Sequence, residues 1–529
     1  MRIACVGGGP GGLFLATLVK SADPSMQVTV FERNRADDTF GFGVVFSDAT
    51  LAGIDDADPV LRRALRDHGV HWDAIEVRLK GERRRCGGNG MAAIARKTML
   101  LLLQERAREV GVELRFQTEV DLDDLAGFDL VVAADGANSR IRARLADQLQ
   151  PTVETAAAKF IWFGTTYMFD GLTFVHEHGP DGVFAVHGYP ISADVSTFIV
   201  ETDERTWQAA GLDEFDVAQP AGVSDQKTKA YLEKLFAEQI DGRSLLVNNS
   251  RWNNFRTRRT ARWHHGNVVL LGDAAHTAHF SVGSGTKMAM EDAVALAAAV
   301  LRHPGEVDAA LDDYEAVARP SVEKIQTSAR PSLSWWEHFG RYHDAFEPWQ
   351  FAFHFLTRAI GGEKLARRDP EFVAATHEAW VAAWGSEPLR SPFRAGDIAF
   401  AERLVTVAET ADGARVVDRH VPLVSAPPRD ASRPWGLWVE APATERDLPA
   451  ALERLHAGLR AAPALVAVHR GSRLTRTLLA EEARLGCGSP TLIVDDAMSR
   501  DDAETAVLSG RTDLVGGSPG AVVRWTAAA

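Results

Sequence analysis

A glycine-rich turn between two short apolar strands is the feature that most constrains how this chain can fold. Residues 2–6 predict a buried strand, residues 13–20 predict an apolar helix, and three glycines between them follow the pattern G-x-G-x-x-G. These glycines are Gly7, Gly9 and Gly12. A second strand, residues 28–31, ends at Glu32, 20 residues beyond the last glycine. This order predicts a Rossmann-type dinucleotide site, in which the glycines admit a pyrophosphate and the acid binds a ribose.

Two later motifs distinguish between FAD and NAD, the two nucleotides whose free ribose 2′-hydroxyl suits Glu32. The first follows an apolar strand, has the pattern D-G-x-x-S-x-x-R and consists of Asp135, Gly136, Ser139 and Arg142. The second follows another apolar strand and consists of Gly272 and Asp273, and then Gly283, Ser284, Gly285 and Thr286 at a helix start. In order and spacing, the three motifs together resemble those of the single-component FAD-dependent aromatic hydroxylases.

The resemblance implies an FAD site and a role for each matching position. Glu32, followed by Arg33, would hold the adenosine ribose, and Arg96 would contact the pyrophosphate region. Asp135 would lie near FAD and the nicotinamide, and Asp273 would bind the ribityl chain or the pyrophosphate, unless it is only a helix N-cap. The following helix would direct its dipole at the flavin ring. The remaining expected FAD-binding positions are Gly7, Gly9, Gly12, Gly272, Gly283, Ser284, Gly285 and Thr286.

Four further stretches resemble one branch of that family. They are residues 39–48, 159–166, 186–190 with 196–201, and 279–287. Over about residues 1–390, the chain is similar to the salicylyl-CoA 5-hydroxylases and to the monooxygenase half of 2-aminobenzoyl-CoA monooxygenase/reductase. This implies hydroxylation of salicylyl-CoA para to its hydroxyl, giving gentisyl-CoA, with NADH or NADPH, O2 and a flavin C4a-hydroperoxide. Alternative substrates are 2-aminobenzoyl-CoA, a free aromatic acid or an indole. The indole is included because violacein-route indole hydroxylases share residues 41–45.

The expected oxygen transfer needs an electron-rich ring carbon, which a group that accepts the phenolic proton would provide. The candidates for this catalytic role are His187, His279, Tyr189 and Ser47, with Phe46 and Phe280 as substrate-binding residues beside them. His279 and Phe280 stand where family members commonly have a proline pair. Each candidate also has a structural alternative. His187 fits a core histidine, Tyr189 a packing residue at a strand end, and Ser47 a helix cap.

A CoA ester brings phosphate groups, and arginine side chains match phosphate oxygens. Two basic runs are candidates for contacts with them. The first contains Arg83 and Arg85, and the second contains Arg256, Arg258 and Arg259. The alternative for each run is an ordinary solvated strand or loop.

Composition limits the possible partners. Lys and Arg total 58 and Asp and Glu total 72, so the net charge is −14, which does not favour nonspecific nucleic-acid binding. The longest apolar run, near residues 293–301, is about half as long as a bilayer span. Three cysteines cannot form a disulfide framework, and no Cys/His cluster has metal-ligand spacing along the sequence. We therefore expect a cytoplasmic protein without metal, membrane or nucleic-acid partners. We also expect a homodimer.

The predicted fold class is α/β, with a Rossmann-like FAD-binding domain interleaved with a substrate-binding β-sheet. The FAD-binding segments are expected at about residues 1–75, 90–150 and 262–330, the sheet at 76–89 and 151–261, and a helical extension at 331–390. Residues 391–529 resemble parts of an old-yellow-enzyme barrel, but these 139 residues fall short of the roughly 200 that a complete barrel needs. At the positions that bind the FMN phosphate in such barrels, Asp495-Asp496 and Gly516-Gly517 stand in place of the usual residues. The sequence therefore predicts a truncated α/β remnant without FMN.

Overall fold

A computed structural model of the protein divides the chain into two compact units and confirms the predicted α/β class. It describes residues 1–39, 41–47, 51–216, 219–220, 222–283, 285–411, 413–418, 421–428 and 433–527. The first unit contains Met1–Gly81 and Gly88–Glu337, and the second contains Glu82–Gly87 and His338–Ala529. Ser284, one of the expected FAD-binding positions, lies outside the described residues.

A mainly parallel sheet carries the nucleotide motifs in the first unit. Its strand order is β16-β17-β9-β1-β2-β8, and every pairing except that of β16 with β17 is parallel. The strands are β1 (Arg2–Val6), β2 (Gln27–Phe31), β8 (Glu113–Arg115), β9 (Leu130–Ala133), β16 (His264–His265) and β17 (Val268–Leu270). Strands β1, β2, β9 and β17 are almost entirely buried, as expected for a parallel sheet covered on both faces.

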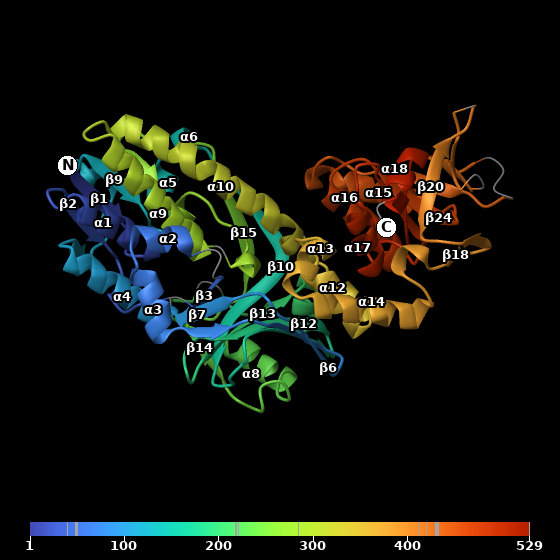
Figure 1. The fold of residues 1–529 in the computed structure, drawn as a ribbon. Helices are drawn as coiled ribbons and strands as arrows, with labels where there is room; N and C mark the ends of the chain where they lie inside the picture. Colours follow the sequence, from blue (N-terminus) through green and yellow to red (C-terminus); the bar gives the residue numbers. More distant parts are fainter. Residues whose placement is uncertain are drawn as a thin grey trace. The chain divides into compact units, whose positions relative to one another are not determined.

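Helices enclose this sheet and contribute most of the apolar core around it. Helix α1 (Pro10–Ala22) packs against α4 (Arg96–Glu109) and α9 (Gly285–Arg302), and α9 packs along the long helix α10 (Val307–Trp336) (Figure 1). A small sheet lies beside α3 (Val60–His68) and α4, and α2 (Ala52–Ala57) packs on α9. Its strands are β3 (Gly43–Ser47), β7 (Met91–Ala95) and β4 (Val70–Trp72).

A second large sheet in the first unit has the order β14-β10-β13-β12-β11-β5, with β15 paired to β10. The strands are β5 (Ile75–Leu79), β10 (Pro151–Thr165), β11 (Leu172–Gly179), β12 (Gly182–Pro190), β13 (Ser196–Thr202), β14 (Leu245–Val247) and β15 (Asn253–Thr260). One face holds Phe163, Phe184 and Phe198, which pack with Leu232 of α8 (Gln226–Leu235). Because side chains alternate along a strand, the opposite face carries His187, Tyr189 and Glu201. The expected segment 76–89 is divided, since β6 (Glu82–Cys86) belongs to the second unit.

The second unit contains a closed barrel, whereas the sequence predicts only a truncated remnant there. Among the described residues the barrel order is β20-β21-β22-β23-β24-β25-β26. The strands are β20 (Leu404–Glu409), β21 (Arg415–Val417), β22 (Val421–Val424), β23 (Gly436–Glu440), β24 (Leu465–His469), β25 (Thr491–Val494) and β26 (Leu514–Gly517). Strand β21 pairs antiparallel with both β20 and β22, so short hairpins complete a ring whose other pairings are parallel. Val405, Leu465 and Leu492 fill the interior.

A layer of helices around the barrel includes the segment that the sequence assigns to a helical extension of the hydroxylase. The helices before the barrel are α11 (Phe339–Ala345), α12 (Pro348–Leu356), α13 (Gly362–Arg368) and α14 (Pro370–Trp384). The helices that lie between barrel strands in the sequence are α15 (Leu448–Leu459), α16 (Arg473–Glu481) and α17 (Arg500–Leu508), and α18 (Pro519–Ala527) follows the last strand. Glu481 of α16 accepts a hydrogen bond from Tyr342 of α11, and its Oε1 lies 3.0 Å from Nε2 of His354 on α12. This buried contact explains why the units divide after Glu337 and not at residue 390.

Candidate functional site

The carboxyl edge of the parallel sheet gathers the nucleotide motifs. Gly7 follows β1, Glu32 follows β2, Asp135 comes two residues after β9, and Gly272 comes two residues after β17. Parallel strands end at a common edge, where open α/β sheets bind their ligands. Segments that are far apart in the sequence are thereby brought together on one side of the sheet.

The glycine turn has the geometry that a phosphate group requires. A Cβ on Gly7, which has a φ of +113°, would lie 2.2 Å from the carbonyl oxygen of Ala134, and one on Gly12 would lie 2.4 Å from that of Gly7. A Cβ on Gly9 would meet no atom within 4 Å, so the chain leaves open space beside this glycine. Gly9 is also the N-cap of α1 and provides no side-chain cap, which leaves the first N–H groups available to an anion.

Glu32 is held in place by backbone donors at the end of β2. Its Oε2 accepts a hydrogen bond of 2.8 Å from the N–H of Gly8, and its Oε1 accepts one of 2.8 Å from the N–H of Asn34. The carboxylate is therefore fixed against the glycine turn, while Arg33 beside it is exposed. This arrangement fits the predicted contact with a ribose.

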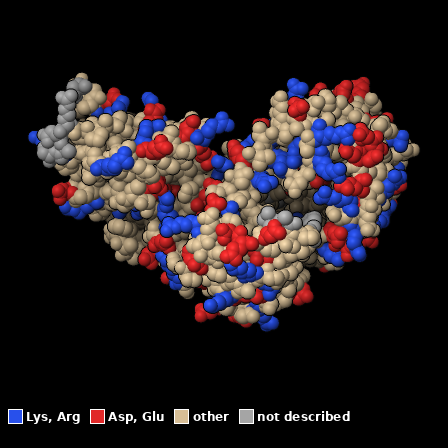
Figure 2. All heavy atoms as spheres, turned by 180° about the vertical axis from the view of Figure 1, so that it is seen from behind, with Lys and Arg blue, Asp and Glu red and all other residues tan. Residues whose placement is uncertain are grey.

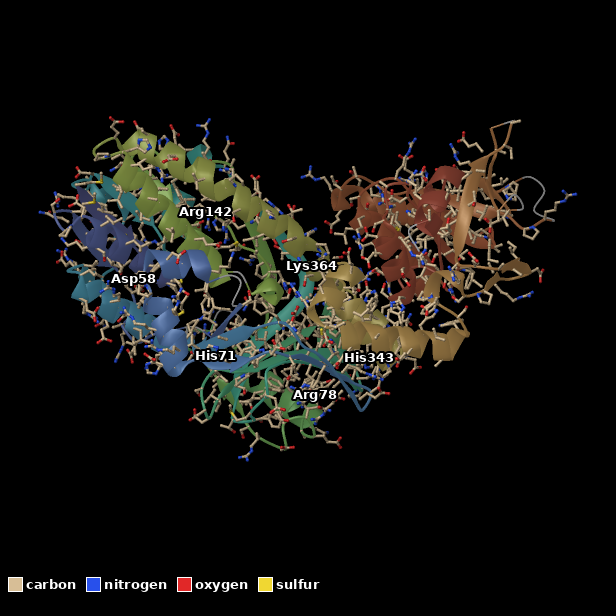
Figure 3. The ribbon with its side chains drawn as sticks, viewed as in Figure 1. Asp58, His71, Arg78, Arg142, His343 and Lys364 are labelled. Atoms are coloured by element: carbon tan, nitrogen blue, oxygen red, sulfur yellow. The ribbon has the colours of Figure 1, made fainter. Side chains whose placement is uncertain are left out.

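Arg142, labelled in Figure 3, forms hydrogen bonds with two of the nucleotide motifs. Its Nη1 donates a hydrogen bond of 2.7 Å to the carbonyl of Ala274, and its Nη2 donates one of 2.8 Å to that of Ala137. Burial lowers the pKa of Arg142 to about 10, so the guanidinium keeps its charge at neutral pH. Asp292 of α9 braces the same loop, because its Oδ2 accepts from the N–H of Gly272 and lies 2.7 Å from Nε2 of His276.

Three charged residues from separate segments act on one another at this edge. Asp273 is exposed although both of its sequence neighbours are buried. The surrounding chain raises the pKa of its carboxyl by desolvation, and Arg96 and Arg258 act in the opposite direction. Asp273 lies within the 3₁₀ turn Gly272–Ala274 and is not the N-cap of that turn, so the alternative role as an N-cap is not supported.

The residues present fit FAD. Among the described residues, Oδ1 of Asp135 and Nε of Arg96 are buried atoms with no hydrogen-bond partner. Such orphaned polar atoms are costly unless a ligand or water satisfies them. Gly283, with a φ of +62°, ends the 3₁₀ turn Phe280–Val282, and Gly285 and Thr286 open helix α9 beyond it.

An aromatic group lies where the 3₁₀ turn before α9 meets the second sheet. The half-buried ring of Phe280 is 5.0 Å from Phe160 and 6.0 Å from Trp162 between ring centroids, and 6.1 Å from Phe255. The guanidinium of Arg96 lies 5.7 Å from the centre of the Trp162 ring. The structure thus places the expected residue Phe280 against aromatic side chains of the second sheet, one of which, Trp162, also adjoins Arg96.

His187 and His279 come together on a residue that the sequence motifs do not single out. Nε2 of His187 is 2.7 Å from Oε1 of Glu201, and Nε2 of His279 is 3.8 Å from Oε2 of the same carboxylate. His187 is 4% exposed, His279 is 2% exposed and Glu201 is 1% exposed, so all three side chains are buried. The signal that could have revealed Glu201 is an acid that directly follows the apolar residues 198–200 within a strand pattern.

The other candidates near the ring have mainly packing contacts. Tyr189 is buried, which raises its pKa to about 12, and its hydroxyl donates a 3.5 Å hydrogen bond to the carbonyl of Gly43. Phe46 is 2% exposed and belongs to the core around the parallel sheet, so its side chain does not line the site. Ser47 is half-buried at the end of β3. These positions agree with the structural alternative for Tyr189, and they remove Phe46 from the substrate-facing set.

The basic run on β15 does not form one cationic surface. Arg256 is exposed, Arg258 is 5% exposed near Asp273, and Arg259 pairs with Glu154 at 3.2 Å. The alternation of side chains along a strand directs Arg259 to the face opposite Arg256 and Arg258, and of these two only Arg256 is exposed. Arg83 and Arg85 are exposed on β6. On the face drawn in Figure 2, acidic and basic side chains are interspersed.

Two groups of potential metal ligands lie on the second unit, although no cluster is visible in the sequence spacing. They are His456, Glu482 and Cys487, and His377, Glu387 and Glu504, each with ligand atoms within 4.8 Å of one another. Glu482 already pairs with Arg341 at 2.7 Å and lies 2.9 Å from His456. No helix in the described part of the chain has the length and apolar character needed to cross a membrane.

Fold and site together define a flavoprotein of the aromatic hydroxylase type, and the comparisons with known proteins agree. Residues 126–329 match the FAD binding domain family. Over 526 residues the chain is 59% identical to a salicyloyl-CoA 5-hydroxylase from Streptomyces sp, covering 98% of this chain and 100% of that protein. The chain therefore belongs to the family of FAD-dependent aromatic hydroxylases, and it is an oxidoreductase with FAD as its cofactor.

A second relative supports the same classification, and a solved structure has a similar fold. The chain is 38% identical over 335 residues to 3-hydroxy-4-methyl-anthranilyl-[aryl-carrier protein] 5-monooxygenase from Streptosporangium sibiricum, which covers 63% of this chain and 89% of that protein. The p-nitrophenol 4-monooxygenase PnpA from Pseudomonas putida DLL-E4 has a TM-score of 0.52 at 20% identity, covering 70% of this chain and 93% of that one. At this identity the similarity concerns the fold alone.

Proposed function

We propose that this protein hydroxylates salicyloyl-CoA para to its ring hydroxyl, giving 2,5-dihydroxybenzoyl-CoA, with NADH or NADPH and O2. The observation that carries the proposal is the 59% identity to a salicyloyl-CoA 5-hydroxylase over 98% of this chain. The similarity includes both compact units, so it extends well beyond the FAD-binding motifs that many hydroxylases share.

The residues at the carboxyl edge of the parallel sheet would hold FAD. The N–H groups at the start of α1 would bind its pyrophosphate beside Gly9, and Glu32 would bind the ribose. Arg96, Asp135 and Asp273 would contact the remaining polar groups. When bound, FAD supplies the activation of O2 with electrons from the nicotinamide. Gly7, Gly12, Gly272, Gly283, Gly285 and Thr286 would shape the backbone of the site.

The aromatic group around Phe280 would exclude water from the substrate ring. Phe160, Trp162 and Phe255 surround it, and Ser281 is the neighbouring hydroxyl. Removal of the phenolic proton raises the electron density of the ring carbon that accepts oxygen. Ser281 and the buried pair His279 and His187 are the groups that would take up this proton. For the CoA phosphates there are two separate candidates: the exposed side chains of Arg83 and Arg85 in the second unit, or the exposed side chain of Arg256 in the first.

The second unit would support the fold without FMN. Oδ1 of Asp496 accepts a hydrogen bond of 2.7 Å from the N–H of Ser518, which lies directly before α18. A helix N-terminus of this kind is where a phosphate would bind, and here an internal carboxylate takes the donor. We also propose that the protein is a homodimer in the cytoplasm. Light scattering measures the mass of the purified protein and so tests the oligomeric state.

Flavin reduction with three ligands in parallel tests the proposed substrate. We expect NADH to reduce the flavin rapidly with salicyloyl-CoA, more slowly with 2-aminobenzoyl-CoA, and least with free salicylate in stopped-flow absorbance. The relative that acts on an anthranilyl group makes 2-aminobenzoyl-CoA the second candidate. Product analysis in air checks for a hydroxylated CoA ester. Equal stimulation by salicylate would contradict a CoA-ester substrate.

A further inference from the structure

Glu201 is a buried carboxylate that two histidines share. It lies on β13 two residues beyond Ile199, which is directly opposite His187 on β12, so His187 and Glu201 point to the same face of the sheet. Oε1 of Glu201 is 2.7 Å from His187, and Oε2 is 3.8 Å from His279. A carboxylate this far from water needs donors or a counter-charge, and two imidazoles lie within ion-pair distance of it.

The contacts of His279 determine which of its nitrogens carries the proton. Nδ1 accepts a hydrogen bond of 3.3 Å from the N–H of Ser281 and lies 2.7 Å from the Ser281 hydroxyl. A neutral imidazole has one donor and one acceptor nitrogen, so Nε2 carries the proton and faces Glu201. His279 is therefore a base on its Ser281 side with a carboxylate behind it. In Ser-His-Asp triads a carboxylate behind the imidazole likewise stabilises the imidazolium, although there the serine and the acid face the opposite ring nitrogens.

We propose that Glu201 is a positioning residue that enables His279 to take up the phenolic proton of the substrate through Ser281. This rests on the proposed function. The phenolic O–H bond breaks and its proton moves to Oγ of Ser281, while the hydroxyl proton of Ser281 moves to Nδ1 of His279. A phenolate and an imidazolium result, and no electrons are transferred. The proton returns along the same path after the ring is hydroxylated.

The position of Ser281 suits this route. Ser281 is half-buried, whereas His279 and Glu201 are closed off from solvent. Its hydroxyl also lies 2.9 Å from that of Ser332 on α10, which fixes its orientation. The substrate would therefore need to reach only the serine, and the charged groups would stay behind it.

Aromatic rings around His279 and His187 strengthen the electrostatic effect of the Glu201 carboxylate. The ring of His279 stacks on Phe280 at 4.3 Å and meets Phe255 edge-on at 4.9 Å, and His187 lies 4.3 Å from Trp336. Opposite charges attract more strongly among such apolar rings than in water. Nε2 of His187 lies 2.7 Å from the other carboxylate oxygen of Glu201, so a second imidazole adjoins the carboxylate. Without Glu201, an imidazolium at His279 would be an uncompensated buried charge.

The test uses the FAD-loaded enzyme with salicyloyl-CoA and without NADH, so that binding occurs without turnover. Difference absorbance reports the fraction of bound ligand that is phenolate. Glu201→Gln should lower that fraction about tenfold and lower kcat on the order of 10²-fold, with less than about a threefold change in the dissociation constant. Glu201→Asp should restore part of both. Glu177→Gln is the matched control, because Glu177 lies on β11 of the same sheet and is bound by Gln239 at 2.6 Å.

Each outcome separates this inference from the proposed function. A wild-type phenolate signal and kcat in Glu201→Gln would overturn the inference, and so would equal losses in Glu177→Gln. Ser281→Ala is the second variant, since it removes only a half-buried hydroxyl, and it should show the same loss of phenolate. The wild-type enzyme binding salicyloyl-CoA without any phenolate signal would also overturn the inference. Failure to hydroxylate salicyloyl-CoA would instead overturn the proposed function.

Discussion

At the scale of single residues, the glycines of the first turn serve two different purposes. Gly7 and Gly12 are required by the folded chain itself, because a Cβ on either would collide with a backbone carbonyl. Gly9 is not required in this way, since the space beside it is open. The motif thus combines a packing requirement with a ligand requirement, and substitutions can separate them.

Gly7→Ala and Gly9→Ala should therefore fail in different ways. Gly7→Ala should destabilise the protein by about 1–3 kcal/mol, because the methyl group overpacks the turn and φ is +113°. Gly9→Ala should leave the melting temperature of the FAD-free protein nearly unchanged but weaken FAD binding at least about tenfold. Thermal unfolding without FAD and fluorescence titration with FAD measure the two effects. Equal losses of stability would show that Gly9 also has a packing role.

The candidate site illustrates what a sequence can reveal about single residues. The positions of the turn glycines, Glu32 and Asp135 at the carboxyl edge of the sheet were predictable because each follows a strand at the spacing of its motif. Glu201 was not, since its importance comes from the register of two strands and from His279, which is 78 positions away in the chain. For Phe46 the sequence prediction did not hold, because an apolar side chain beside a site has the same sequence signature as one in the core.

At the scale of elements, a buried polar cluster fastens helices α11 and α12 to α16 in the second unit. Glu481 contacts Tyr342 and His354, and Arg511 donates to the carbonyl of His354 at 2.8 Å and to Thr357 at 3.0 Å. Burial, with help from the charge of Arg511, lowers the pKa of His354 to about 4. The cluster is a source of pH-dependent stability within this unit.

The sign of this pH dependence follows from the two states of His354. In the unfolded chain it titrates near 6.5, and in the folded protein near 4. Between these values the unfolded chain binds more protons, so stability falls as the pH falls, by about 2.5 kcal/mol from about pH 7.5 to about pH 4.5. Urea unfolding at both pH values should show this loss in the wild type but not in His354→Gln. His456→Gln, at an exposed histidine, is the control and should keep it.

At the scale of the whole molecule, the division of the chain differs from the sequence expectation for a physical reason. The helices of residues 338–390 follow the hydroxylase motifs in sequence, and their apolar residues could pack on either side. Phe353, Leu365 and Trp380 pack with Leu479 and Val507 of the barrel helices. Amphipathic patterning shows that a helix has a buried face, but it does not show which partner covers that face.

Truncations at two positions test this division. A chain that ends at Arg390 keeps the helices but loses the barrel residues that cover Phe353, Leu365 and Trp380. It should bind a hydrophobic dye and aggregate more than a chain that ends at Glu337. Dye fluorescence and light scattering compare the two with the full-length protein. A monodisperse chain ending at Arg390 with low dye binding would contradict the division after Glu337.

The pairing of β21 with β20 and β22 determines which backbone edges the shortened barrel exposes. Removing parts of a parallel barrel ordinarily exposes the unpaired backbone of two strands, and exposed edges invite pairing with other molecules. Here a three-residue strand, Arg415–Val417, occupies both edges at once. In the described part of the barrel, the pairing of β21 therefore covers the two strand edges that would otherwise be open to pairing with other molecules.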